Sequence, residues 1–549
     1  MESPPQRSSN GWAWKSTPGN PPLNSGGSKR KKQEGNASGK GISLFLYPSG
    51  WGEIMVGPCS WLYQASRRWP KKEAIFDEEL SLRFEDLYEN SLRVAKWLGK
   101  KGRPGQRVVI ALPFSVPAAV LYFGTLFAGM VAVPVDTGLS PDRFGLLLEE
   151  IDPLLVIGSS DFDSKPSWDS KRGWLVNSYQ DLDALTRSLN RKQDLPALDD
   201  DPLRLLHVIY TSGTTGLSKG VMLHGANLEA VAVGIEKTLA INEDHTIFTA
   251  LSFAHTYGLS HLWLMARRGA SLGVVQDITR MAVIKEIITG RCVDVIAGVP
   301  YHFALFTRRG EKVRWDRVRL VTVAGDAPSK TLIQKMKVSF PNARIHIMYG
   351  LTEASTRLTA LPPEDLERKE GSMGLPINGV ELKVIDENRE ELGPHQAGEL
   401  IARGANITPG YWEDERLTRK TIIDGWLRTG DIVKKDEEGY YYHLGRKDSV
   451  FKSGGEKIIP EAIEKVIREA EGVRDAAVIG KEDLYRGNTI CAVIVKEEGS
   501  DLSPGKVISI CRARLDRLWT PHEVIFAEEI PRSSNGKIRY DLLRKKFSA

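Results

Sequence analysis

Residues 205–220 read Leu-Leu-His-Val-Ile-Tyr-Thr-Ser-Gly-Thr-Thr-Gly-Leu-Ser-Lys-Gly, an apolar run followed by small and hydroxylated residues and a lysine. The apolar part, 205–210, predicts a buried strand, and a helical pattern begins near Ala226. In between, glycines let the backbone approach a ligand closely, and backbone N–H groups, hydroxyls and the Lys219 ammonium can face one anion. A loop of this composition predicts a polyphosphate site, with ATP as the ligand.

This loop differs from the common P-loop, in which a Ser or Thr that binds Mg²⁺ directly follows the lysine. Here Gly220 follows Lys219. A flexible surface loop is the alternative for a short stretch of this kind. The whole run, however, resembles the phosphate loop of the acyl-adenylate-forming superfamily, which includes acyl-CoA synthetases, adenylation domains of peptide synthetases and luciferases. By that resemblance, ATP is bound by Thr211, Ser212, Gly213, Thr214, Thr215, Gly216 and Lys219.

The composition is ordinary for a globular protein except at the beginning of the chain. Of the 549 residues, 41% are hydrophobic and 26% charged, which is enough for several domains and a large core. The net charge of +5 belongs to residues 1–40, so the remainder is close to neutral and gives no electrostatic case for binding nucleic acid. Residues 1–41, rich in Pro, Gly, Ser and Asn, predict a disordered basic tail without the apolar segment of a secretory signal.

Residues 108–135 carry no charged side chain and are long enough to cross a bilayer. Pro113, Pro117 and Pro134 interrupt this stretch, which favours a short strand, a helix and a second strand buried in a core. We therefore expect no transmembrane segment. The four cysteines are scattered, which indicates a reducing compartment, and we expect a cytoplasmic protein without structural zinc.

Short apolar runs alternate with helical patterns between residues 205 and 403. This alternation predicts an α/β fold with mostly parallel sheets, whose ligands bind at the carboxyl ends of the strands. The expected strands in this region are 246–250, 293–298, 318–324 and 345–348.

The pattern changes twice further along the chain. From Gly379 the strands become shorter and predict a β-rich subdomain. After Gly445 a compact series of helices and strands, with helices expected at 460–470 and 504–518, predicts a small α+β domain. We expect a tail (1–41), a large N-terminal domain (42–445) and a small, mobile C-terminal domain (446–549).

Three further motifs follow expected strands, and each resembles a motif of the same superfamily. In Tyr349-Gly350-Leu351-Thr352-Glu353 an aromatic ring can stack on adenine, a hydroxyl can contact the α-phosphate, and a carboxylate can hold Mg²⁺. The resemblance assigns adenine stacking to Tyr349 with Gly350 and the α-phosphate contact to Thr352. It assigns the binding of Mg²⁺ to Glu353, with Thr211 as the second metal ligand. Gly325, Asp326 and Ala327 resemble the wall of the adenine site, and His255 resembles the histidine that positions the acid. Without the resemblance, an ordinary turn and a core histidine explain these last two motifs equally well.

The remaining motifs lie towards the C-terminus. The resemblance assigns the ribose hydroxyls to Asp431, ribose or phosphate to Arg446, and a hinge to Asp448. Lys452 lies in the segment 451–457, which would enter the active site for a second half-reaction. Lys537, in Pro531-Arg-Ser-Ser-Asn-Gly-Lys537, matches the lysine that bridges acid and phosphate. The motifs Gly398–Gly404 and Pro409–Trp412 are interpreted as scaffold.

These residues predict an AMP-forming acid–thiol ligase. A small carboxylic acid attacks ATP in the presence of Mg²⁺ to give acyl-AMP and pyrophosphate, and the acyl group passes to CoA. A stand-alone enzyme that loads the phosphopantetheine of an acyl carrier protein is the close alternative, and a non-catalytic nucleotide-binding homologue is a third. The expected pocket walls are largely apolar, which favours a fatty or aryl acid and a role in fatty acid metabolism. Arg357 is expected either to meet a second polar group of the substrate or to lie on the surface.

Overall fold

Two central strands of the first sheet come from the stretch of sequence that lacks charge. The computed structural model of the protein describes residues 57–159, 173–176, 178–186, 201–211, 219–308, 314–453, 456–483, 487–515, 517–532 and 538–547. Among these residues, one sheet has the strand order β6-β5-β3-β4-β7-β8, parallel except for the antiparallel pair β7–β8. Its strands are β3 (Arg107–Ala111), β4 (Val131–Pro134), β5 (Leu155–Gly158), β6 (Gly173–Leu175), β7 (Leu205–Thr211) and β8 (Lys219–His224). The strand-helix-strand prediction for 107–135 is confirmed, whereas β8 was not predicted.

The second sheet contains the strands expected between residues 246 and 348. Its order is β15-β14-β13-β12-β11-β9-β10-β1-β2, and the strands from β13 to β1 in this order are parallel. The bounds are β1 (Glu73–Phe76), β2 (Ser81–Arg83), β9 (Thr246–Thr249), β10 (Ser271–Val274), β11 (Val295–Gly298), β12 (Leu320–Val323), β13 (Arg344–Tyr349), β14 (Thr359–Leu361) and β15 (Leu375–Pro376). The α/β prediction is therefore confirmed.

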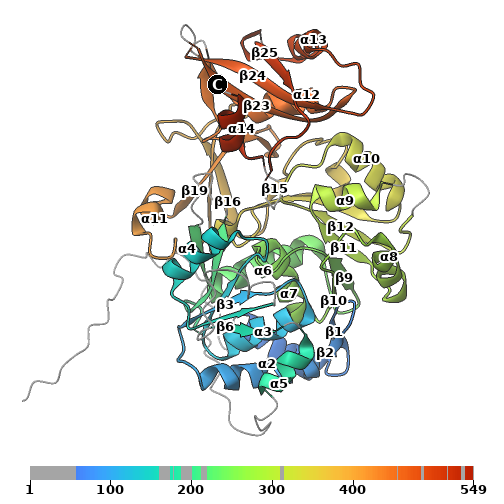
Figure 1. The fold of residues 1–549 in the computed structure, drawn as a ribbon, viewed down its shortest axis with the longest axis vertical. Helices are drawn as coiled ribbons and strands as arrows, with labels where there is room; N and C mark the ends of the chain where they lie inside the picture. Colours follow the sequence, from blue (N-terminus) through green and yellow to red (C-terminus); the bar gives the residue numbers. More distant parts are fainter. Residues whose placement is uncertain are drawn as a thin grey trace, which may run out of the picture. The chain divides into compact units, whose positions relative to one another are not determined.

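Helices that are apolar on every side pack together with residues of both sheets (Figure 1). In α7 (Thr256–Arg268) every residue from Thr256 to Ala266 is buried, and in α3 (Val116–Phe127) every residue except Pro117 is buried. A helix without a polar face is stable only when it is enclosed by other elements. No helix in the described part of the chain is both long enough and apolar enough to cross a membrane.

The other helices cover the sheets or belong to the later parts of the chain (Figure 1). They are α1 (Pro58–Arg68), α2 (Phe84–Gly99), α4 (Pro141–Ile151), α5 (Tyr179–Thr186), α6 (Gly225–Leu239), α8 (Met281–Gly290), α9 (Pro300–Phe306), α10 (Lys330–Ser339), α11 (Glu415–Thr421), α12 (Pro460–Arg468), α13 (Pro504–Arg514) and α14 (Tyr540–Phe547), with the 3₁₀ turns η3 (Thr352–Ala354), η4 (Pro363–Asp365) and η5 (Arg517–Trp519).

The β-rich subdomain predicted from Gly379 is an antiparallel sheet in which β19 is the central strand. The strands pair in the order β16-β17-β19-β18, and β20 also pairs with β19. Their bounds are β16 (Val380–Ile385), β17 (Gly398–Gly404), β18 (Ile422–Ile423), β19 (Trp426–Lys435) and β20 (Tyr441–Arg446). Pairing of β19 with β20 brings Asp431 opposite Arg446.

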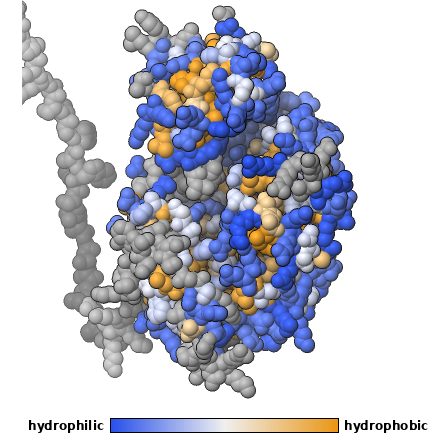
Figure 2. Space-filling view, turned by 45° about the vertical axis from the view of Figure 1, so that its right-hand side comes forward, coloured by the Kyte–Doolittle hydropathy of each residue, from blue (hydrophilic) through white to orange (hydrophobic). Residues whose placement is uncertain are grey.

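The C-terminal part of the chain has its own sheet, β23-β24-β25, and a hairpin, β21-β22. The bounds are β21 (Phe451–Ser453), β22 (Glu456–Ile458), β23 (Val473–Asp483), β24 (Gly487–Lys496) and β25 (Glu523–Phe526). Apolar residues on one face of the sheet pack with α12 and α13, and those on the other face pack with α14. The expected helix 504–518 ends at Arg514 instead. In the face seen in Figure 2 hydrophilic residues predominate, and apolar residues reach the surface in separate patches, the largest in the upper part of the view.

Candidate active site

The loop after β13 is folded tightly back on itself. A side chain on Gly350 would place its Cβ 1.9 Å from the carbonyl oxygen of Thr356, so only glycine fits at this position of the Tyr349–Glu353 motif. The turn η3 then follows and packs against β8, the strand that begins at Lys219. The motif after β13 is therefore next to the strand that leaves the phosphate loop.

Asp431 gathers three side chains at the end of β13. Its buried carboxylate accepts hydrogen bonds from the Tyr349 hydroxyl, from Arg446 Nη1 at 2.8 Å and from His443 Nε2 at 3.4 Å. Burial alone would raise the pKa of the Asp431 carboxyl, but the donors His443, Arg446 and Tyr349 outweigh burial and lower it to about 2. Tyr349, Asp431 and Arg446, predicted separately from sequence, are thus one hydrogen-bonded group, and His443 is a fourth member that no sequence signal indicated.

This pKa shift predicts how the stability of the protein changes with pH. A carboxyl with a pKa of about 2 in the folded protein and an ordinary value of 3.8 stabilises the fold above about pH 4, and the stabilisation is lost as the pH falls towards 2. We expect Asp431→Asn to lower the free energy of unfolding by about 2 kcal/mol at pH 7. Denaturant unfolding at a series of pH values should show this difference shrinking below pH 4. A difference that stays constant down to pH 2 contradicts the prediction.

Glu353 is held by a residue that the sequence analysis assigned to scaffold. Tyr411 donates its hydroxyl hydrogen to Glu353 Oε1 at 2.9 Å, and the backbone N–H of Thr408 donates to the Glu353 carbonyl at 2.8 Å. The same segment is joined to β8, because Trp412 N donates to the Gly220 carbonyl at 2.7 Å. The motif Pro409–Trp412 therefore ties the acidic residue to the end of the phosphate loop. In the sequence, this contact was indicated only by the presence of Tyr411 in a motif that resembles one of the superfamily.

The two ends of the phosphate loop are opposite each other. Thr211 and Lys219 are paired residues at the last position of the antiparallel β7–β8 ladder. The predicted ATP-binding residues between them, Ser212, Gly213, Thr214, Thr215 and Gly216, lie outside the described residues, as does Lys537. Arg532 and Ile538, on either side of the Lys537 segment, form an antiparallel bridge.

Other predicted site residues lie at two separate places, the turn after β12 and strand β21. Gly325 follows β12 with φ +92°, a conformation that favours glycine, and Asp326 Oδ1 accepts from the Ala327 N–H at 2.8 Å. Lys452 lies exposed on β21, and its carbonyl accepts from Asn488 Nδ2 at 3.0 Å. These positions fit the predicted assignments but contain no contact that would test them.

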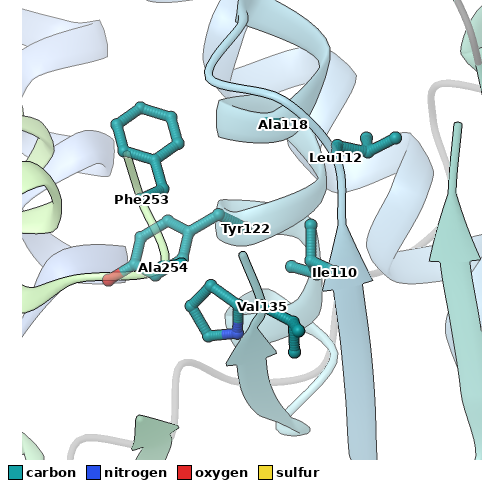
Figure 3. A pocket seen from close by; sticks show the side chains of 8 residues that line it. Ile110, Leu112, Ala118, Tyr122, Val135, Phe253 and Ala254 are labelled. Atoms are coloured by element: carbon teal, nitrogen blue, oxygen red, sulfur yellow. The ribbon is translucent and has the colours of Figure 1, made fainter. Parts of the chain in front are cut away.

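His255 caps the buried helix α7 and faces Asp136 across the end of β4. The distance from His255 Nε2 to Asp136 Oδ2 is 3.8 Å. Figure 3 shows a small pocket in which Phe253 and Ala254, the two residues before His255, lie near side chains of α3 and of the ends of β3 and β4. Its one hydroxyl, on Tyr122, already accepts from Trp263 Nε1 and contacts His207 Nε2, each at 2.8 Å. The lining of the pocket is therefore apolar apart from a hydroxyl whose hydrogen bonds are already made within the protein.

Two family models match the chain over these motifs. One, described as AMP-binding enzyme, covers residues 62–412, and the other, AMP-binding enzyme C-terminal domain, covers residues 462–537. The chain belongs to the AMP-binding enzyme family. The resemblance to acyl-adenylate-forming enzymes is thus confirmed.

Members of this family with names or structures are similar to almost the whole chain. A 2-succinylbenzoate–CoA ligase from Bacillus cereus (strain AH820) is 29% identical over 490 residues, which are 88% of this chain and 98% of the relative. The structure of o-succinylbenzoate CoA synthetase (MenE) from Bacillus subtilis in complex with ATP and magnesium ion has a TM-score of 0.77 at 25% identity, covering 88% of this chain and 99% of that one. A fatty acyl CoA synthetase from Mycobacterium tuberculosis has a TM-score of 0.72 at 26% identity, covering 90% and 98%.

The donor set at Glu353 is compatible with Mg²⁺ in an AMP-binding enzyme. Mg²⁺ prefers hard oxygen ligands and is usually held by one or two protein groups together with phosphate and water. A carboxylate on Glu353 and a hydroxyl on Thr211 are ligands of that kind. No cluster of three or more His, Cys, Asp or Glu side chains suited to a metal occurs among the described residues, so a fully protein-ligated metal has no support there.

The Tyr411–Glu353 hydrogen bond predicts a measurable effect in this AMP-binding enzyme. Tyr411→Phe removes a hydrogen bond to a charged group, so we expect a loss of about 10-fold in kcat/KM for ATP, most evident at low Mg²⁺. Pyrophosphate release measured against Mg²⁺ concentration provides the assay. Tyr442→Phe is the matched control, because the Tyr442 hydroxyl donates to Asp436 at 3.1 Å and contacts no predicted site residue. Equal losses after the two substitutions would contradict a role of the Tyr411–Glu353 hydrogen bond in the use of ATP and Mg²⁺.

Proposed function

We propose that this protein is an AMP-forming ligase that joins a carboxylic acid to the thiol of CoA. The observation that carries the proposal is the joined arrangement of Tyr349, Asp431 and Arg446 at the end of β13, in a member of the AMP-binding enzyme family. An aromatic ring beside an ionised carboxylate and a guanidinium suits a nucleoside with its base, ribose and phosphate. The 2-succinylbenzoate–CoA ligases among the relatives support the same reaction class.

The reaction proceeds in two half-reactions. In the first, an oxygen of the substrate carboxylate forms a bond to the α-phosphorus of ATP, and the bond from that phosphorus to the bridging oxygen of pyrophosphate breaks. In the second, the sulfur of CoA attacks the acyl carbon of the acyl-AMP, AMP leaves, and the thiol proton is released. No protein nucleophile is required, so catalysis depends on positioning and charge neutralisation.

Each residue of the site has a part in this scheme. Asp431 accepts hydrogen bonds from the ribose hydroxyls, and it also positions the Tyr349 ring on which adenine stacks. Thr352 contacts the α-phosphate, His255 orients the incoming carboxylate, and Lys219 and Lys537 neutralise phosphate charge. Mg²⁺, when bound by Glu353 and Thr211, supplies further neutralisation of the phosphates.

The second half-reaction uses a different position of the C-terminal domain, with the boundary between domains at residue 446. In Asp448, the proposed hinge, the Oδ1 atom lies 3.5 Å from Arg446 Nε. Next to it, Ser449 Oγ donates to Glu461 on α12 at 2.8 Å, so the first residues after the hinge are attached to the C-terminal domain. Rotation at Asp448 therefore withdraws Lys537 and brings the segment around Lys452 towards the nucleotide.

CoA rather than a carrier protein is the proposed acceptor, because relatives named as CoA ligases cover nearly the whole chain. For the acid, the 2-succinylbenzoate ligases among the relatives favour an aryl acid over a fatty acid, although a fatty acyl CoA synthetase is also similar in structure. The expected role in fatty acid metabolism therefore has less support than the ligase activity.

The test is pyrophosphate release with ATP, Mg²⁺ and a panel of aryl and fatty acids, with and without CoA. Acid-dependent release that CoA stimulates, with a thioester detected by mass spectrometry, supports the proposal. Acid-dependent release that CoA leaves unchanged points to carrier-protein loading. ATP binding without release for any acid indicates the non-catalytic alternative.

A further inference from the structure

Arg357 is a buried cation in the loop that carries Thr352 and Glu353. It exposes 2% of its surface, so the alternative of a surface residue is wrong. Its guanidinium carbon lies 4.2 Å from the centre of the Tyr257 ring, Nη1 donates to Thr356 Oγ1 at 3.0 Å, and Nε contacts Met348 Sδ at 3.2 Å. All of these partners are uncharged.

No carboxylate of the described residues lies within 4.0 Å of the Arg357 guanidinium. Burial consequently lowers the pKa of Arg357, and the nearby Tyr257 only partly opposes this. The one other cation in the buried class of described residues, Lys369, has the usual arrangement, since its Nζ is 2.7 Å from Asp436 Oδ2 and also pairs with Glu438. An unpaired buried charge is costly, so a ligand that supplies a counter-charge to Arg357 would be bound favourably.

Arg357 follows the Tyr349–Glu353 motif and lies against the helix that begins directly after His255. Tyr257, which covers the guanidinium, is two residues beyond His255 on α7. The Tyr257 hydroxyl donates to the Thr322 carbonyl at 3.0 Å and lies 3.4 Å from the Gly298 carbonyl, at the ends of β12 and β11. The guanidinium is therefore on the carboxyl side of the central parallel strands, the side on which α/β sheets bind ligands.

The backbone that carries Arg357 is held in an unfavourable conformation. Ser355 and Thr356 have φ values of 53° and 106°, and Thr is β-branched, so the second value is a strained one. Asn406 holds this segment, because its Nδ2 donates to the Ala354 carbonyl at 3.1 Å and to the Arg357 carbonyl at 3.0 Å. A strained backbone held by Asn406 thus directly precedes the buried Arg357 side chain.

We propose that Arg357 binds a second carboxylate of the acid substrate, and that the enzyme activates a dicarboxylic acid by one of its two carboxylates. This inference rests on the proposed function and adds the substrate class. A planar guanidinium suits bidentate pairing with a carboxylate, and the second carboxylate supplies the missing counter-charge. The name 2-succinylbenzoate describes an acid of this class, with one carboxylate on the ring and one on the chain.

The experiment compares matched acids that differ only in the second carboxylate. One set is 2-succinylbenzoate, 4-oxo-4-phenylbutanoate, which lacks the ring carboxylate, and 2-butyrylbenzoate, which lacks the chain carboxylate. Aliphatic and simple aryl pairs are adipate with hexanoate and terephthalate with benzoate. Pyrophosphate release gives kcat/KM for each acid. We expect the diacid to be preferred in at least one set by about 30-fold, the effect of one hydrogen-bonded charged pair. Preference for the monoacid in every set overturns the inference.

The decisive variant is Arg357→Met, which has a similar length and no charge. It should abolish the preference by lowering kcat/KM about 30-fold more for the diacid than for the monoacid. Equal losses for both acids would assign Arg357 a purely structural role and overturn the proposal. Arg357→Lys keeps the charge without the planar fork and should retain part of the preference.

Thermal unfolding separates an effect on the site from a failure to fold. Removing an unpaired buried charge should leave Tm unchanged or raise it, whereas the control Lys369→Met leaves Asp436 without its partner and should lower Tm without altering acid preference. If no acid supports pyrophosphate release, the proposed function fails by itself. Binding at Arg357 is then measured as the shift in Tm that the diacid alone causes. A shift that is present in the wild type and lost in Arg357→Met supports the anion site. No shift in the wild type overturns the anion site.

Discussion

Replacing Asp431 with alanine should lower kcat/KM for ATP about 10³-fold, because the substitution removes the carboxylate that is proposed to accept two hydrogen bonds from the ribose hydroxyls. The substitution also removes the acceptor of the Tyr349 hydroxyl and the partner of Arg446. The Tyr349 ring, which is proposed to stack on adenine, and the Arg446 guanidinium then lose the carboxylate that holds both of them. The expected effect is therefore larger than that of any single donor, and kinetics of pyrophosphate release at varied ATP concentration will measure it.

Deoxynucleotides distinguish a ribose contact from a general loss of structure. The wild-type enzyme should discriminate against 2′-deoxy-ATP and 3′-deoxy-ATP, and Asp431→Ala should accept these nucleotides nearly as well as it accepts ATP. The matched control is Asp436→Ala in the same hairpin, where the carboxylate pairs with Lys369 and accepts from Tyr442. It should affect stability without changing nucleotide preference. If Asp431→Ala keeps the full discrimination against both deoxynucleotides, Asp431 is not the ribose ligand.

The sequence predicted the site best where candidate functional residues come directly after a strand. The runs that became β9, β11, β12 and β13 are short, apolar and parallel, and Gly325 and Tyr349 come at or just after the ends of β12 and β13. Since parallel strands present their carboxyl ends at one edge, the placement of these motifs along the same edge of the sheet follows from local pattern alone. The uncharged run 108–135 was likewise predicted from its prolines.

Contacts between distant segments were not predictable in the same way. Tyr411 and Glu353 are 58 positions apart, and no periodicity or turn signal relates them. His443 reaches Asp431 through the register of the β19–β20 pair, which depends on a bulge between Ile432 and Val433. Burial of Arg357 could not be derived either, because a lone arginine after a turn is ordinarily exposed. The short strand β8 was missed since glycine and lysine at its start suggested continued loop.

Replacing Lys537 with alanine should lower the rate of acyl-AMP formation by about 10²-fold or more, the loss typical of one charged donor at a developing phosphate charge. Formation of the thioester from preformed acyl-AMP should change much less, because the proposed rotation at Asp448 removes Lys537 from the site before CoA reacts. Rapid-quench measurement of each half-reaction separates these two effects. Lys545→Ala provides the control, since it removes an equal charge from an exposed position on α14. Equal losses in both half-reactions after Lys537→Ala would contradict the alternation of the C-terminal domain. A loss confined to acyl-AMP formation means that Lys537 acts only in that half-reaction. Rotation of the C-terminal domain, which removes Lys537 before CoA reacts, accounts for this result.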